Sequence, residues 1–190
     1  METVQPIRDI TKIEGMKQYL LKRPFGARNH LLFTLGINSG LRVSALLRLK
    51  LNDITDETGC PAKRIRIREK KTGKEKNFPV TKKCQAAIEL YLGTLAAPKP
   101  NAPVFLSKKG GPITRQAAWQ ILNAAAEAVG IKENIGTHTL RKTWGYHSYN
   151  AGAPLEVIQA ALNHTSPKDT LRYIGITQDD VDDIYAVVDL

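Results

Sequence analysis

The chain of 190 residues is poor in cysteine, and it lacks both a long apolar run and a low-complexity linker. Neither its two cysteines, Cys60 and Cys84, nor its four histidines show a metal-ligand spacing, which argues against a metal centre. No apolar stretch approaches the ~20 residues that a membrane-spanning helix needs. With few cysteines and no signal peptide, the sequence is typical of a cytoplasmic protein outside the membrane.

Acidic residues are also scarce relative to basic ones. The chain has 28 Lys and Arg against 18 Asp and Glu, a net charge of +10. Such a balance favours a polyanionic partner, most simply nucleic acid, with a ribosome-associated or merely basic protein as the alternative. Residues 177–190 hold five aspartates and no Lys or Arg, so the rest of the chain carries about +15. We expect this acidic tail to contact protein rather than DNA.

The length predicts a single domain over residues 1–190, with a core at about 11–176 and an acidic C-terminal helix or tail at 177–190. Thr11 is the expected N-cap of the first helix, and Thr177 that of the last. The last helix would carry an apolar stripe of Val181, Ile184, Tyr185 and Val188. Periodicity and breakers predict helices at 11–22, 26–38, 43–48, 82–94, 114–129, 138–151, 154–163 and 167–173.

Strand signals are few. Residues 64–68 (Arg-Ile-Arg-Ile-Arg) alternate as a half-buried strand does, and Asn77–Val80 reads as the returning strand. The two form a β-hairpin near 63–81 with a basic tip, and Val104–Leu106 is predicted as a further short strand. The expected fold class is therefore mainly α with a small antiparallel sheet (α+β).

Six residues suit the chemistry of phosphodiester exchange. Arginines can hold the charge that develops on the non-bridging oxygens, histidines can bind phosphate or accept a proton, a lysine can protonate the leaving 5′ oxygen, and a tyrosine can attack. The phenol has a pKa of about 10, so it needs a base and positive surroundings. The candidate catalytic residues are Arg42, Lys71, His138, Arg141, His164 and the nucleophile Tyr173.

In this scheme Tyr173 becomes linked to DNA through a 3′-phosphotyrosine, His138 is the base and Lys71 is the general acid. Because the bond energy is kept, the reaction needs no cofactor, metal or ATP. Taken singly, each residue has an ordinary explanation, such as a surface arginine, a capping histidine or a tyrosine at the edge of the core. The order of the whole set carries the hypothesis.

The chain resembles the catalytic domain of the tyrosine recombinase (phage integrase) family. Ser39-Gly40-Leu41-Arg42 is similar to the family's first arginine motif, and His138-Thr139-Leu140-Arg141 to its His-x-x-Arg box. Lys71 in Lys-Thr-Gly is similar to the hairpin lysine, with Lys70 and Lys74 as neighbouring alternatives. Leu162-Asn163-His164 is similar to Leu-Gly-His, and Tyr173 has the family's nine-residue spacing from it.

Two positions depart from the family pattern. Ala45 stands where members usually have an acidic residue that helps to hold the first arginine. Asn163 replaces a glycine, a mild change because asparagine tolerates the left-handed conformation. The family's N-terminal core-binding domain is not expected in this chain, which would be either a fragment of a longer integrase or a naturally short member.

The resemblance implies a site-specific DNA recombinase or integrase, an enzyme of mobile genetic elements that acts on double-stranded DNA. It further implies a tetramer on DNA assembled through the C-terminal segment, a monomer off DNA, and possible accessory DNA-bending proteins. Two alternatives stay open: a nicking-closing enzyme like the type IB topoisomerases, and a catalytically impaired DNA-binding regulator with the same fold.

Overall fold

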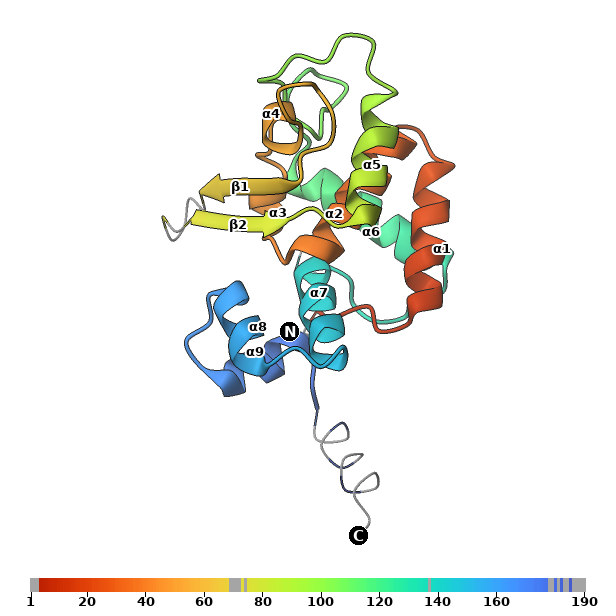
Figure 1. Ribbon diagram of the computed structural model, residues 1–190. Helices are drawn as coiled ribbons and strands as arrows, with labels where there is room; N and C mark the ends of the chain where they lie inside the picture. Colours follow the sequence, from red (N-terminus) through yellow and green to blue (C-terminus); the bar gives the residue numbers. More distant parts are fainter. Residues whose placement is uncertain are drawn as a thin grey trace.

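The computed structural model describes residues 4–68, 73, 75–136, 138–177, 180, 182 and 185. Within these residues it is mainly helical, with one two-stranded antiparallel sheet. Figure 1 shows two parts of unequal size: a larger one that contains the sheet and most of the described helices, and a smaller one formed by the two helices within residues 155–174. No helix among the described residues has the length and apolarity to span a bilayer.

The larger part is built around one helix that is buried on almost every side. This is α2 (Gly26–Ser39), which buries Leu31, Leu32, Phe33 and Leu35 completely. A helix that is apolar all round belongs in a core. It packs against α1 (Ile10–Leu21), α5 (Lys82–Leu92) and α7 (Thr139–Asn150), while α6 (Arg115–Ala128) covers α1.

The hairpin pairs β1 (Arg64–Arg68) with β2 (Glu75–Pro79), Arg64 opposite Pro79 and Arg68 opposite Glu75. Ile65 is buried and the arginines on either side are exposed, as the alternating sequence predicts. In Figure 1 the hairpin projects to the left, above the smaller part of the molecule. The expected tip, Lys70 to Lys74, lies outside the described residues except for Gly73.

Three local predictions are wrong. Val104–Leu106 is not a strand, because Pro103 and Leu106 make only isolated bridges, to Lys50 and Pro112.

The N-cap of α1 is Asp9, whose carboxylate accepts from the Thr11 and Lys12 amides, so Thr11 lies inside the helix. The sequence also missed the one-turn helix α4 (Leu51–Ile54), and α3 (Val43–Leu46) ends two residues before the predicted boundary.

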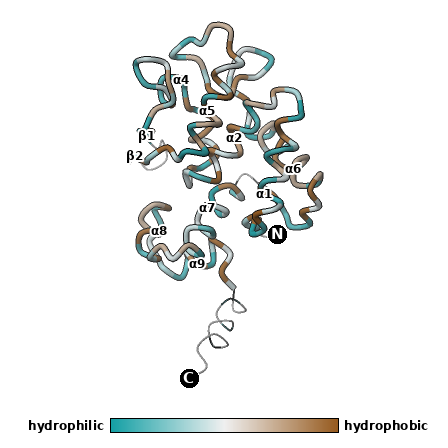
Figure 2. The backbone as a smooth tube through the Cα atoms, turned by 45° about the vertical axis from the view of Figure 1, so that its right-hand side comes forward, coloured by the Kyte–Doolittle hydropathy of each residue, from teal (hydrophilic) through white to brown (hydrophobic). Residues whose placement is uncertain are grey.

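The smaller part consists of α8 (Leu155–Leu162) and α9 (Pro167–Ile174), which pack on each other and on the second half of α7. Its core is small: Ile158, Leu162 and Ile174 are buried, with Trp144 and Tyr173 packed against them. Figure 2 shows this hydrophobic stretch on α8, separate from those of the larger part. Beyond Thr177 the structure describes only Asp180, Asp182 and Tyr185, so the predicted apolar stripe of the last helix lies mostly outside the described residues.

Helix α9 approaches α7 so closely at Gly145 that there is no room for a side chain at this position. A Cβ built there would lie 2.6 Å from Ile174 Cγ2. Alanine in a helix is normally better than glycine by roughly 0.5–1 kcal/mol. We expect Gly145→Ala to lower the free energy of unfolding instead, by about 1–3 kcal/mol of overpacking. Urea unfolding measures the difference. The matched control is Gly93→Ala, where the nearest atoms lie at 3.6 Å, and which should be neutral or stabilising.

Candidate active site

Arg42 is placed by a turn that only a glycine permits. Helix α2 ends at Gly40, which has φ of +59°, and a Cβ on Gly40 would lie 2.7 Å from the Trp144 ring. The chain then turns so that Arg42 is the N-cap of α3. Its guanidinium lowers the pKa of His138, His164 and Tyr173, and it therefore faces the same place as these three side chains.

Arg141 is a buried cation held by backbone carbonyls. It lies on α7 with 1% of its surface exposed. Its Nη1 donates to Gly40 O at 2.5 Å, and its Nη2 donates to Leu162 O at the end of α8. Hydrogen bonds from a charged donor are worth about 1.5–3 kcal/mol each. One guanidinium thus ties the turn before Arg42 to the helix before His164.

The two histidines flank the tyrosine. His138, the N-cap of α7, has Nδ1 3.2 Å from Tyr173 Oη. His164 follows the C-cap of α8, and its ring meets the Tyr173 ring edge-on with centroids 4.7 Å apart. His164 Nδ1 lies 3.2 Å from Thr170 Oγ1, which itself donates to Ser166 O. These two hydrogen bonds therefore fix the His164 ring against the helix that carries Tyr173.

Asn163 allows this arrangement as the sequence predicts. It is the C-cap of α8 and adopts the left-handed conformation, with φ of +51° and ψ of 44°. Glycine and asparagine are the residues that end helices in this way. The chain reverses there and carries His164 back towards α9.

The pKa values of the three groups are set by burial and by the arginines. Burial lowers the pKa of both His138 and His164, and Arg141 and Arg42 lower each further, joined by Arg115 at His138. Burial raises the pKa of the Tyr173 phenol, while Arg141 and Arg42 act to lower it. Both imidazoles are therefore neutral near pH 7, and His138 can accept a proton from the phenol.

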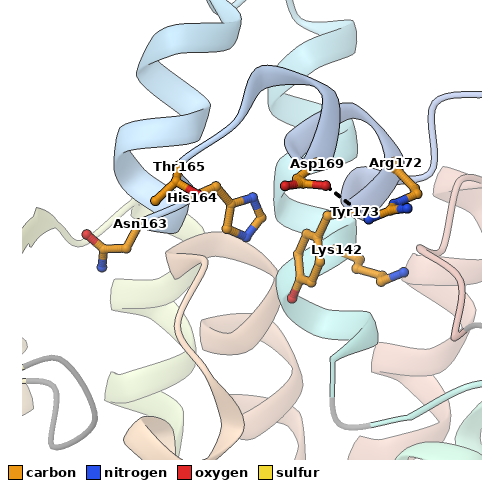
Figure 3. A pocket seen from close by; sticks show the side chains of 7 residues that line it. All are labelled: Lys142, Asn163, His164, Thr165, Asp169, Arg172 and Tyr173. Atoms are coloured by element: carbon orange, nitrogen blue, oxygen red, sulfur yellow. Dashed lines mark hydrogen bonds and ion pairs between the residues drawn. The ribbon is translucent and has the colours of Figure 1, made fainter.

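The pocket in front of Tyr173 has a volume of about 470 Å³. In Figure 3 Tyr173 lies between the His164 ring on one side and Lys142 on the other. Asp169 also lines it, and its Oδ1 accepts from Arg172 at 3.0 Å. No group of three or more His, Cys, Asp and Glu in the described part of the chain is arranged to hold a metal.

Lys71, the predicted general acid, lies outside the described residues, as do Lys70 and Lys74. The described lysine that links the hairpin to this region is Lys76, whose Nζ donates to Ala161 O at 2.7 Å. The sequence prediction missed Lys76. The signal available was its position on the returning strand of the hairpin, two residues after Lys74. The prediction also missed Lys142, which directly follows Arg141 and lies in the pocket.

Ala45 is buried beside a cavity of about 210 Å³ that also touches Arg48, Arg66 and Arg68. The carboxylate that lines this cavity belongs to Asp53 of α4, whose Oδ2 also accepts from the Lys50 amide at 2.8 Å. An acidic group thus lies near the position of residue 45 although residue 45 itself is alanine.

The chain is similar to a known protein family and to several solved structures. The sequence profile of the Phage integrase family matches residues 9–179. The chain is 40% identical over 188 residues to the probable integrase/recombinase YoeC of Bacillus subtilis, with 98% of each chain covered. It is 32% identical to the tyrosine recombinase XerC of Pelobacter propionicus over 161 residues, which cover 85% of this chain and 52% of the relative.

The chain belongs to the phage integrase family. Its fold matches the XerA recombinase with a TM-score of 0.78 at 18% identity, covering all of this chain and 65% of that one. A lambda integrase dimer bound to a core site matches with a TM-score of 0.68 at 17% identity, over 93% of this chain and 51% of that one. The predicted fold class and the predicted enzyme class, a site-specific tyrosine recombinase, are confirmed. The chain spans nearly all of the Bacillus relative but only about half of the XerC relative.

The lowered histidine pKa values predict how stability depends on pH. A histidine that binds a proton more weakly when folded stabilises the fold fully above its unfolded pKa of about 6.5. That stability is lost as the pH falls through the folded pKa. We expect the free energy of unfolding of DNA-free protein, measured by urea titration, to fall between pH 7.5 and 5. The His138→Gln, His164→Gln double variant should fall less steeply. Part of the slope will persist, because burial also lowers the pKa of His30. An unchanged slope would contradict the electrostatics described above.

Proposed function

We propose that this chain breaks and rejoins duplex DNA at specific sites through a 3′-phosphotyrosine intermediate. The observation that carries the proposal is the hydrogen bond of 3.2 Å between Tyr173 Oη and His138 Nδ1, beside two arginines and a second histidine. A phenol, a neutral base and fixed cations are the groups that attack on a phosphodiester requires.

Tyr173 Oη forms a bond to phosphorus as its proton passes to His138 Nδ1. Arg42, Arg141 and His164 hold the non-bridging oxygens, where negative charge grows in the transition state. The bond from phosphorus to the 5′ oxygen breaks, and that oxygen takes a proton from Lys71. A 5′ hydroxyl from another strand then reverses the sequence, so the DNA is rejoined and no metal, cofactor or ATP is used.

Attack is proposed to occur in cis. Tyr173 and the groups around it belong to one chain, and α9 rests on α7 of the same chain. The Arg141 guanidinium donates to the carbonyls of Gly40 and Leu162 and also lowers the pKa of the Tyr173 phenol, so its charge acts directly on the proposed attacking group.

Tyr173→Phe should abolish the covalent adduct while changing DNA binding little, because only the attacking oxygen is removed. The assay traps adducts on nicked duplexes built from repeats that flank the gene, without metal or ATP, and resolves them on a denaturing gel. Tyr149→Phe, which packs in the same small core, is the matched control and should still form the adduct. Adduct formation by Tyr173→Phe would overturn the assignment. Binding without any trapping by wild type would favour the regulator, and relaxation of any supercoiled plasmid would favour the topoisomerase-like enzyme.

Strand exchange is further proposed to take place in a tetramer on DNA, with accessory DNA-bending proteins where the site requires them. Residues 1–190 would act as one catalytic domain, and residues 177–190 would dock on a neighbouring protomer. Support comes from the acidic composition of this segment and from Tyr185, which is 76% exposed.

The assembly can be counted on a four-way junction built from the same repeats. We expect four protomers per junction by mass photometry and one protomer in free solution. A chain that ends at Ile176 should bind DNA as single protomers with loss of the four-protomer species. A tetramer formed equally well by the shortened chain would show that another surface joins the protomers.

A further inference from the structure

Lys142 is a buried lysine with an unusual environment. It is 7% exposed, although lysine is almost never fully buried without a partner of opposite charge. It shares the pocket with Tyr173, and its Nζ lies 5.2 Å from the centre of the Tyr173 ring. Among the described residues, no carboxylate lies within ion-pair distance of this ammonium, and Asp169 is paired with Arg172.

A cation over an aromatic face is attracted by the negative charge of the ring. The attraction is larger when the ring belongs to a phenolate, because ionisation places more negative charge on it. A cation in this place therefore favours the ionised form of the phenol. It also occupies the side of the ring opposite His164, so the ring is held between two groups (Figure 3).

We propose that Lys142 is a positioning residue for the nucleophile: its ammonium holds the Tyr173 ring against His164 and stabilises the negative charge that the phenol acquires during attack. The inference rests on the proposed role of Tyr173. Burial lowers the pKa of Lys142, as expected for a cation that is partly removed from water. Arg42, His138, Arg141 and His164 also act on or contact Tyr173 from neighbouring elements, and Asp169 and Arg172 of its own helix line the same pocket.

The direct test is the titration of Tyr173 itself. Tyrosine labelled with ¹³C at Cζ gives six signals, one for each tyrosine of the chain, and Tyr173→Phe identifies the relevant one. In Lys142→Met we expect the pKa of Tyr173 to rise by about one unit, the shift that a desolvated cation–π contact implies. Lys142→Arg should restore it, because a guanidinium also stacks on aromatic faces. The matched control is Lys168→Met, which removes an exposed charge from α9, the helix that carries Tyr173. It should leave the pKa of Tyr173 unchanged.

Cleavage and stability complete the test. With saturating nicked duplex at neutral pH, Lys142→Met should form the covalent adduct about tenfold more slowly, in line with one pKa unit. Its free energy of unfolding should be unchanged or higher, because an unpaired buried ammonium is costly. If Lys142 had only a structural role, Lys142→Met would instead lower the free energy of unfolding and leave the pKa of Tyr173 unchanged.

Two further outcomes would overturn the inference. An unchanged pKa together with a salt dependence of DNA binding that is shallower by about one ion would mean that Lys142 contacts a phosphate. An unchanged pKa with normal cleavage would mean that it has no role. Neither outcome bears on Tyr173 as the nucleophile, since the trapping experiment with Tyr173→Phe tests that separately and the titration needs no activity.

Discussion

The architecture of the site depends on the two hydrogen bonds that the Arg141 guanidinium makes with the carbonyls of Gly40 and Leu162. The first carbonyl ends the central helix α2 just before Arg42, and the second ends α8 just before His164. Because Arg141 itself lies on α7, one buried side chain sets the mutual position of three segments that are far apart in the sequence. Backbone carbonyls carry no net charge, so they hold the cation without neutralising it. A carboxylate in their place would have cancelled the charge that a phosphate needs.

Cations also hold the helix ends of the smaller part. The last carbonyls of a helix have no partner within it and carry its negative end. Arg141 of α7 donates to Leu162 O at the end of α8. Lys76 of the hairpin donates to Ala161 O, and Arg8 of the N-terminal segment donates to Gly175 O at the end of α9. Among the described residues the core of this part contains three buried hydrophobic residues, and polar links join the part to the hairpin and to the N-terminal segment. Tyr173 is thus carried by a unit whose position depends on contacts with several other segments.

Local patterns predicted most of the fold, and long-range contacts explain the rest. The alternation of Arg64–Arg68 and the breakers around the helices were sufficient for the hairpin and for helix boundaries within a few residues. Val104–Leu106 was mistaken for a strand because its apolar residues fill the core without an adjacent strand to pair with. The resemblance to the family supplied the candidate residues, and the structure brings Arg42, His138, Arg141, His164 and Tyr173 to one place. Lys142 was missed because its burial leaves no local sequence pattern. Arg8 was missed because its hydrogen-bond partner, Gly175, lies 167 residues away in the sequence.

The same positive field acts in opposite directions on the two histidines and on the Tyr173 phenol. Arg42 and Arg141 favour the ionised phenol, but they also weaken the proton affinity of His138 and His164. A phosphate bound between the arginines would offset part of their charge, and the pKa of His138 would then rise, so the base would become stronger when substrate is present. The phenol would lose part of the same support, while the ammonium of Lys142, 5.2 Å from the centre of the Tyr173 ring, would continue to act on it. Under the proposed roles, the site would bind an anion at the arginines and keep a further cation on the ring face, one that also lowers the pKa of His138.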